Sequence, residues 1–443
     1  MSLTQTLTLP AALPAADPIA ASAEWESSAR SYVRSLPVVF AHAEGPWLID
    51  TAGRRYLDFL GGAGVMVLGH NHPAVRAAVA ADEAPVINGL DLLTTAKLAF
   101  VERLRAILPW SMASSHKLHF CGPTGSDAIE AALKLAALAT GRRGVIAFAG
   151  GYHGMTQGAL SVSSSRRLRE AGLLAPAAVT FCPYPYPLRF PEPYRTPAAA
   201  TAFCLASLRM MIEDNHSGIG LPGMVLLEAV QGEGGTIVAP SAFLVGVAEL
   251  CRRHGILLAL DEIQSGMGRT GRWFAFEHAG IEPDIVCLSK GVGGGYPLSL
   301  LLFHRRLDVW RPGDHIGTFR GQQIAMTAGR ATIETIVADG LLANAARLGA
   351  QLRRGIEKAA LGHQAVAEVR GRGMMLGIEM EAHRGVAAGT LAARLQAALF
   401  AAGVVVEVGG RDGAVVRLLP PLTTGVEEVG LFLAAFARAL TAL

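Results

Sequence analysis

Short, unbroken apolar runs separated by helix-length stretches constrain the fold more than any other feature of this sequence. Five such runs cover residues 117–120, 144–148, 224–227, 256–260 and 283–289. Runs of this kind are typical of a parallel sheet that helices cover on both faces. Sheets of this type bind ligands outside the carboxyl ends of their strands. The sequence therefore predicts an α/β fold with a mainly parallel sheet and a binding site along one edge.

Lys290 ends the run 283–289 and precedes a glycine-rich segment, residues 291–295. It is the one lysine of five in an apolar context. A buried lysine without a partner is costly, and an ion pair, a lowered pKa or a Schiff base with a carbonyl relieves that cost. A lysine reaching from a strand end to solvent is the simpler alternative. The polar residues that follow the other runs favour the catalytic interpretation.

A tight turn containing Gly125 and Ser126 precedes an amphipathic helix predicted over residues 128–135. Free N–H groups at a helix N-terminus, together with a hydroxyl, favour an anion such as phosphate. The same residues also suit a simple helix cap. The turn lacks the Gly-Lys-Ser/Thr of a nucleotide P-loop, so ATP is not the favoured ligand.

Other polar residues at the strand ends suit an aromatic, cationic ligand. Asp261 follows the run 256–260, and an ionised acid there requires a cation such as a pyridinium nitrogen. Tyr152 offers a face for ring stacking, although core packing explains it equally well. Gln264 is placed to bond a ring oxygen, and Glu228 and His153 end or follow neighbouring runs. With the lysine and the phosphate site, these residues predict a pyridoxal 5'-phosphate site.

Five motifs in this order resemble those of the class III aminotransferases, which are fold type I pyridoxal-phosphate enzymes. The motifs are residues 122–134, 151–154, 228–235, 261–271 and 288–291, and the likeness runs from about residue 46 to residue 422. The resemblance implies that Lys290 forms the Schiff base and moves the proton, and that Asp261 pairs with the ring nitrogen. It also implies that Gln264 contacts the ring hydroxyl, and that Gly125 and Ser126 hold the phosphate.

Three further positions match residues that bind substrate or reach a second subunit in that family. Thr318 matches a threonine that contacts the phosphate of the neighbouring subunit, which implies a homodimer with shared active sites. Arg417 matches the arginine that grips the α-carboxylate of 2-oxoglutarate or glutamate. Glu233 matches an acid that pairs with that arginine while a donor with a distal amine is bound. Such a switch lets one site accept two unlike substrates.

Within the class, residues 59–73, 89–97 and 315–321 resemble diaminobutyrate–2-oxoglutarate aminotransferases. This likeness implies exchange of the terminal amine of L-2,4-diaminobutyrate with 2-oxoglutarate, giving aspartate 4-semialdehyde and glutamate. Arg320, where many relatives have glycine, joins the predicted substrate residues. The alternatives are a related enzyme for ornithine, 4-aminobutyrate or a pathway-specific amine, a racemase or epimerase, and a catalytically silent homologue. Arg417 and Glu233 favour transamination, because a racemase needs no keto-acid partner.

The composition argues against some classes of partner and indicates a cellular location. The net charge of +3 comes from 39 basic and 36 acidic residues without long runs, which disfavours nucleic acid and membrane surfaces as partners. Five cysteines without a Cys-x-x-Cys pair suggest reduced thiols and a cytoplasmic protein. No apolar stretch reaches the length of a membrane span. His70 and His72 have no further ligand at suitable spacing, so no metal site is predicted.

The predicted domain organisation has four parts. Residues 1–23 read as a flexible arm, without the charged start of a signal peptide. Residues 24–70 are assigned to a smaller α/β domain, and residues 71–325 to the large cofactor-binding domain. Residues 326–443 return to the small domain, with strands predicted over residues 374–380 and 404–408.

Overall fold

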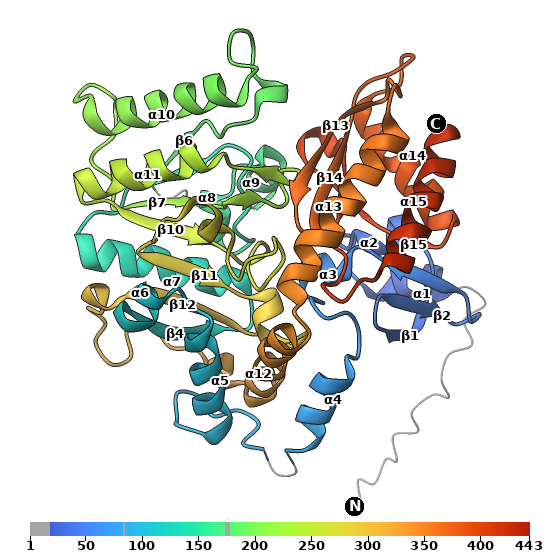
Figure 1. Cartoon of the computed structure of the whole chain (residues 1–443). Coiled ribbons are helices and arrows are strands. Elements are labelled where there is room, and N and C mark those ends of the chain that lie inside the picture. The colour runs from blue at the N-terminus through green and yellow to red at the C-terminus, as the bar shows by residue number, and fades with distance from the viewer. Residues whose placement is uncertain (1–17, 83–84, 173–177) are drawn as a thin grey trace, which may run out of the picture.

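The chain folds into two lobes, seen side by side in Figure 1. This computed structural model describes residues 18–82, 85–172 and 178–443. The larger lobe contains a seven-stranded sheet, and the smaller lobe combines segments from both ends of the chain. No helix among the described residues is both long enough and apolar enough to span a membrane.

The sheet of the large lobe confirms the predicted mainly parallel architecture. Its strands, in spatial order, are β4 (His116–Gly122), β12 (Ser299–His304), β11 (Ile285–Leu288), β10 (Leu257–Asp261), β7 (Met224–Leu227), β5 (Val145–Phe148) and β6 (Val179–Cys182). All five predicted runs form strands of this sheet. Only β12 is antiparallel to its neighbours, β11 and β4. The parallel strands therefore end at one common edge.

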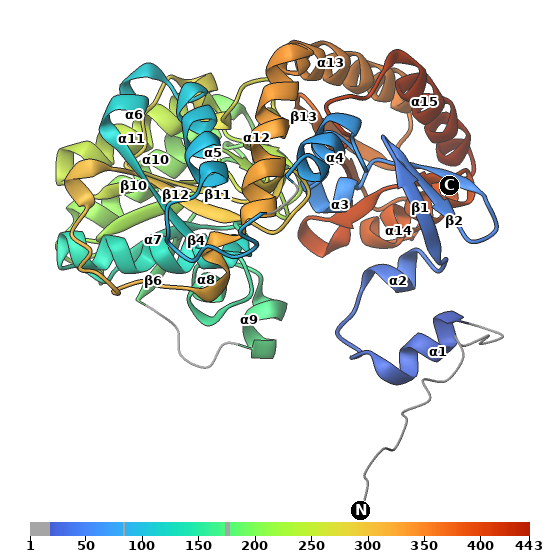
Figure 2. The ribbon, with the colours of Figure 1, turned by 90° about the horizontal axis from the view of Figure 1, so that it is seen from below.

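Burial on both faces explains why these strands are apolar throughout. In β7, Met224 and Leu226 belong to one hydrophobic cluster, whereas Val225 and Leu227 belong to another on the opposite face. Helices cover both faces of the sheet in Figures 1 and 2. The helices of this lobe are α5 (Thr95–Ala106), α6 (Trp110–Ser115), α7 (Gly125–Thr140), α8 (Gln157–Val162), α9 (Arg166–Gly172), α10 (Pro197–Glu213) and α11 (Ser241–His254).

The small lobe joins N-terminal and C-terminal segments in one sheet. This sheet runs β1 (Phe40–Glu44), β2 (Trp47–Asp50), β3 (Arg55–Asp58), β15 (Val404–Val405). A second sheet runs β13 (Val366–Arg372), β14 (Met375–Met380), β17 (Val415–Leu418), β16 (Glu407–Gly409). Helices α13 (Leu341–Ala360), α14 (Ala388–Ala401) and α15 (Val426–Thr441) pack against them, and α3 (Gly61–Gly64), α4 (Pro73–Ala80) and α12 (Gln323–Ala338) lie toward the large lobe.

The prediction of a single strand over residues 404–408 is wrong. The chain leaves one sheet after Val405 and enters the other at Glu407, so the run divides between two sheets. The apolar run of residues 404–406 gives no sign of the break, because Val406 is buried like its neighbours. The division places Glu407 opposite Arg417 across an antiparallel pair of strands.

Helix α1 (Pro18–Trp25) covers residues 18–23 of the predicted arm, and the rest of that arm lies outside the described residues. Helix α1 and the short helix α2 (Tyr32–Ser35) extend from the small lobe in Figure 2. The pairing of β3 with β15 supports a small domain built from both chain ends. The boundaries at residues 23, 70 and 325 stay predictions.

Glu262 is a fully buried acid that ties the end of β10 to a following loop. Its carboxylate accepts hydrogen bonds from the Ser265 hydroxyl and from the N–H groups of Ala275 and Phe276. Burial raises the pKa of Glu262 from an ordinary 4.5 to about 7. The folded chain therefore favours the protonated carboxyl.

We expect Glu262→Gln to flatten the dependence of stability on pH. Because the folded pKa exceeds the unfolded one, the stabilisation from the protonated acid is complete below pH 4.5 and is lost as the pH rises through about 7. An amide does not ionise in this range. Thermal unfolding of parent and variant between pH 5 and pH 8 measures the difference, with the exposed Glu427→Gln as control. Parallel curves for parent and Glu262→Gln would contradict the expectation.

Candidate active site

The carboxyl ends of the parallel strands border a cavity of about 170 Å³. Nine of the twelve predicted site residues line it. The full lining is Gly125, Ser126, Tyr152, His153, Gly154, Glu228, Glu233, Asp261, Ile263, Gln264 and Lys290. The topology that was predicted from the apolar runs thus brings these residues together. Thr318, Arg320 and Arg417 lie outside this lining.

Lys290 begins the short turn that follows β11 and is held in an unusual backbone conformation. Its φ is +50°, in the left-handed region that a residue with a Cβ rarely adopts. The next residue has to be glycine, since a Cβ on Gly291 would lie 2.6 Å from a methyl of Val67. Burial lowers the pKa of Lys290, although nearby Glu233 opposes the shift. Among the described residues the Lys290 amine has no hydrogen bond, which leaves it free to react.

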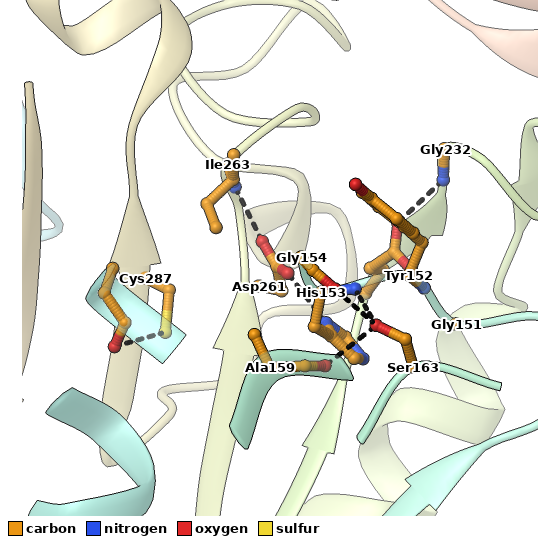
Figure 3. Close-up of polar contacts among 12 residues, drawn as sticks. Gly151, Tyr152, His153, Gly154, Ala159, Ser163, Gly232, Asp261, Ile263 and Cys287 are labelled. Atoms are coloured by element: carbon orange, nitrogen blue, oxygen red, sulfur yellow. Dashed lines mark hydrogen bonds and ion pairs between the residues drawn. The ribbon is translucent and has the colours of Figure 1, made fainter. Parts of the chain in front are cut away.

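Asp261 ends β10 and is bound directly by His153, as Figure 3 shows. His153 Nδ1 lies 2.7 Å from Asp261 Oδ2, and the N–H of Ile263 donates to Oδ1 at 3.0 Å. Burial by itself would lower the pKa of His153, but its hydrogen bond to Asp261 and the charge of that carboxylate outweigh burial and raise it. The sequence placed His153 in the pocket but did not predict this contact, because the two residues follow different strands.

Glu228 fixes the loop that carries Tyr152. Its carboxylate accepts the N–H of Tyr152 at 3.0 Å and that of Gly232 at 2.7 Å. Burial raises the pKa of Glu228, and the neighbouring His153 opposes the shift. Ser163 accepts the N–H of His153 at 2.8 Å from the other side of the loop (Figure 3). The backbone on either side of the tyrosine is thereby held in place at the cavity.

Arg417 is a fully buried residue of β17, and its guanidinium pairs with two acids, Glu233 and Glu407. Its Nη1 lies 2.7 Å from Glu233 Oε2 and 3.1 Å from Glu407 Oε2, and its Nη2 donates to Gln264 Oε1 at 2.8 Å. Tyr32 donates to Glu407 Oε1 at 2.7 Å. The sequence anticipated the pair with Glu233, but it missed Glu407 and Tyr32. For Glu407 the sequence does offer one signal, an acid that follows an apolar run. Its pairing with Arg417 becomes apparent only from the register of β16 and β17.

Thr318 and Arg320 lie in the turn of residues 318–321, and neither lines the cavity. Thr318 is exposed, and its carbonyl accepts a hydrogen bond from the side chain of Asn88. Arg320 pairs with Asp91 at 2.6 Å and donates to the carbonyl of His315. The structure of this chain therefore does not bring either residue to the predicted site.

The cavity fits pyridoxal 5'-phosphate in the chemistry of its residues. It combines an amine without a hydrogen bond at Lys290, a buried carboxylate at Asp261 and the N-terminus of α7 at Gly125 and Ser126. In the part of the chain that the structure describes, no group of three or more His, Cys, Asp or Glu residues is arranged to hold a metal ion. His70 instead contacts Asp58 at 2.7 Å.

Comparisons with known proteins agree with this chemistry. The family model described as aminotransferase class III matches residues 28–440. The diaminobutyrate–2-oxoglutarate aminotransferase of Rhizobium meliloti (strain 1021) is 44% identical over 430 residues, covering 93% of this chain and 91% of the relative. The Haemophilus influenzae enzyme of the same name is 42% identical over 425 residues, covering 94% of this chain and 93% of the relative.

A solved structure of a transaminase has the same fold at lower sequence identity. The PLP-bound amine transaminase from an uncultivated Pseudomonas species is 30% identical, with a TM-score of 0.83 over 94% of this chain and 97% of the other. Fold and site together define a fold type I pyridoxal-phosphate enzyme. The chain belongs to the class III aminotransferase family. It is a pyridoxal 5'-phosphate-dependent transaminase, which moves an amino group between an amino donor and a 2-oxo acid.

Proposed function

We propose that this transaminase exchanges the terminal amine of L-2,4-diaminobutyrate with 2-oxoglutarate, giving aspartate 4-semialdehyde and glutamate. The observation that carries the proposal is the ion pair of the buried Arg417 with Glu233, an acid that lines the cavity of Lys290. While an acid pairs with the arginine, the positive charge of the arginine does not repel a cationic donor. When the acid moves away, the arginine can bind a dicarboxylate. The relatives at 44% and 42% identity carry the name of this activity, which adds support.

We assign the cofactor contacts to the residues that line the cavity. When bound, the cofactor supplies an electron sink for bond cleavage at the substrate carbon. Lys290 would hold the cofactor covalently, and its released amine would move the proton of the substrate carbon that bears the amino group. Asp261, oriented by His153, pairs with the ring nitrogen. The remaining contacts are Gly125 and Ser126 to the phosphate, Tyr152 to the ring face, Gln264 to the ring hydroxyl, and Glu228 through the loop it fixes.

Arg417 and Glu233 have different arrangements in the two half-reactions. The charge of Arg417, followed by that of Lys290, lowers the pKa of Glu233 against the opposing effect of burial, so the acid stays ionised and paired. While the diamine occupies the site, this pair keeps the guanidinium away from the donor. When glutamate or 2-oxoglutarate enters, Glu233 withdraws and the guanidinium binds the α-carboxylate in bidentate fashion.

A donor panel tests this function. The cofactor-loaded enzyme is mixed with 2-oxoglutarate and one amine at a time, and glutamate is measured by chromatography. The panel contains diaminobutyrate, ornithine and 4-aminobutyrate. We expect diaminobutyrate to give the highest kcat/KM, and an enzyme that ignores it but accepts either of the other amines would refute the proposed donor.

We further propose a homodimer with shared active sites and a cytoplasmic location. Thr318 is exposed outside its own cavity, and the neighbouring Ile316 and Phe319 are apolar side chains that are 70% and 63% exposed. An apolar patch of this kind suits a subunit interface. Arg320, next to it, is assigned to substrate binding across the same interface. The cytoplasmic location is supported by five cysteines that are all free and buried.

Mixed dimers offer a check on site sharing. We expect Thr318→Ala to weaken cofactor retention and Lys290→Ala to be inactive. In a heterodimer of the two variants, one site combines an intact Lys290 with an intact Thr318, so activity should return to about half of the parent's value per dimer. Heterodimers purified with two different tags allow the measurement. If verified heterodimers show no recovery over the two homodimers, the sites are not shared.

A further inference from the structure

Glu407 is a buried acid next to the substrate-binding residues. It begins β16, and its Cα is paired with that of Arg417 in β17, so the two side chains lie on one face of the sheet. The pair of strands holds the carboxylate in place, and the hydroxyl of Tyr32 binds its Oε1 at 2.7 Å. Glu407 is therefore a fixed acid, in contrast to Glu233, which lies in an irregular segment between short strands and has a side chain that is 34% exposed.

One oxygen of this acid has no hydrogen bond. Glu407 is only 8% exposed, yet its Oε2 lacks a hydrogen-bond partner in the described part of the chain. The Nη1 of Arg417 is 3.1 Å away, which makes an ion pair but not an aligned hydrogen bond. Buried carboxylate oxygens are normally hydrogen-bonded, and this one, beside the predicted substrate residue Arg417, is free to accept a hydrogen bond from a ligand.

The charges around Arg417 do not balance. Two acidic side chains, Glu233 and Glu407, lie against one guanidinium, so the cluster holds more acidic groups than basic ones. Lys290 lies close enough for both acids to affect its pKa, which places Glu407 in the electrostatic environment of the reacting amine. A diamino acid with both amines protonated carries one net positive charge, and a monoamino acid carries none. The cluster is therefore complementary to a donor with a second ammonium group.

We propose that Glu407 binds the α-ammonium group of a diamino acid donor and thereby selects diamino acids over monoamino acids of equal length. The inference rests on the proposed function for its choice of diaminobutyrate, but the contact applies to any α,ω-diamino acid. The buried Oε2, which has no hydrogen-bond partner among the described residues, accepts the hydrogen bond from the ammonium, while Tyr32 keeps Oε1 in place. Glu233 covers Arg417 at the same time, so the donor meets no free guanidinium.

A matched pair of substrates isolates this contact. L-2,4-Diaminobutyrate and 4-aminobutyrate differ only in the α-ammonium group, and ornithine and 5-aminovalerate form a second such pair. Glu407→Gln keeps an oxygen for Tyr32 but removes the charge. We expect it to lower kcat/KM for each diamino acid by about 10- to 100-fold, the loss typical of a hydrogen bond to a charged group, and to leave the monoamines nearly unchanged.

Two controls separate this role from a role in positioning Arg417. Tyr32→Phe removes the hydrogen bond to Glu407 but keeps its charge, so it should affect the diamino acids only slightly. Glutamate reports on Arg417, and its kcat/KM should not fall in Glu407→Gln. A loss confined to glutamate, or equal losses for diamino and monoamino donors, would overturn the proposal and make Glu407 a positioning residue for the arginine.

Equilibrium binding gives a readout that does not depend on turnover. In cofactor-loaded Lys290→Ala protein, calorimetry should show the Glu407→Gln change weakening diaminobutyrate by about tenfold or more and 4-aminobutyrate hardly at all. A parent enzyme that prefers ornithine would refute the proposed donor but leave the contact to be judged on the ornithine pair. If Glu407→Gln changes the affinity for the diamino acid and for the matched monoamine equally in both substrate pairs, the contact with Glu407 is refuted.

Discussion

Lys290→Ala is expected to lower turnover by at least about 10³-fold while the fold stays intact. The substitution removes the covalent link to the cofactor and the proton carrier together. The left-handed backbone at residue 290 and the position of the amine at the cavity, where no described residue hydrogen-bonds it, motivate the expectation. Alanine shortens the side chain without filling the cavity, so the phosphate contacts at the start of α7 should still retain the cofactor.

Borohydride reduction followed by peptide mass spectrometry measures the covalent link directly. The parent should carry the cofactor mass on the peptide containing Lys290, and the variant should carry it nowhere. Lys358→Ala, an exposed lysine on α13, is the matched control and should behave as the parent. Cofactor attached to another lysine in the parent, or appreciable activity in Lys290→Ala, would remove Lys290 from the mechanism.

Arg417→Ala is expected to impair the glutamate half-reaction far more than the diaminobutyrate half-reaction. Removing a buried guanidinium that pairs with a carboxylate costs about 2–5 kcal/mol, which corresponds to about 30-fold to several thousand-fold in kcat/KM. Glutamate needs the guanidinium for its α-carboxylate, whereas the diamine reacts while Glu233 covers it. Stopped-flow spectroscopy of the bound cofactor with each amine separately measures the two halves.

The same substitution leaves two buried acids without their cation, so stability has to be measured beside activity. Loss of the pair with Glu233 and Glu407 is expected to lower the melting temperature. Arg417→Lys keeps the charge but not the bidentate fork, and should restore stability more fully than it restores glutamate turnover. Equal losses in both half-reactions at unchanged fold would contradict the proposed switch.

Much of the large lobe could be predicted from the sequence, because each strand of its sheet is marked by a local run of apolar residues. Strands buried on both faces have to be apolar throughout, as Met224–Leu227 shows, and parallel strands have to end at a common edge. That reasoning alone predicts that Lys290 and Asp261 lie at one cavity, and both line it. The family resemblance supplied the individual roles, and those roles remain to be tested.

The contacts that were missed depend on pairings between distant segments. The bond from His153 to Asp261 joins residues 108 positions apart, and no local pattern reports it. The carboxylate of Glu407 faces Arg417 because the chain changes sheets at Val406, and the continuous valine run of residues 404–406 gives no sign of that change. Thr318 lies outside the lining of the cavity, and no local sequence pattern reports that position.

Transfer of a labelled nitrogen tests the central claim most directly. The enzyme is incubated with 2-oxoglutarate and diaminobutyrate that carries ¹⁵N at its terminal amine, and the glutamate formed is analysed by mass spectrometry. Exchange of the terminal amine predicts that the glutamate carries the label and that aspartate 4-semialdehyde appears in equal amount. Unlabelled glutamate from this donor, labelled glutamate from donor marked at the α-amine instead, or no glutamate at all would contradict the account.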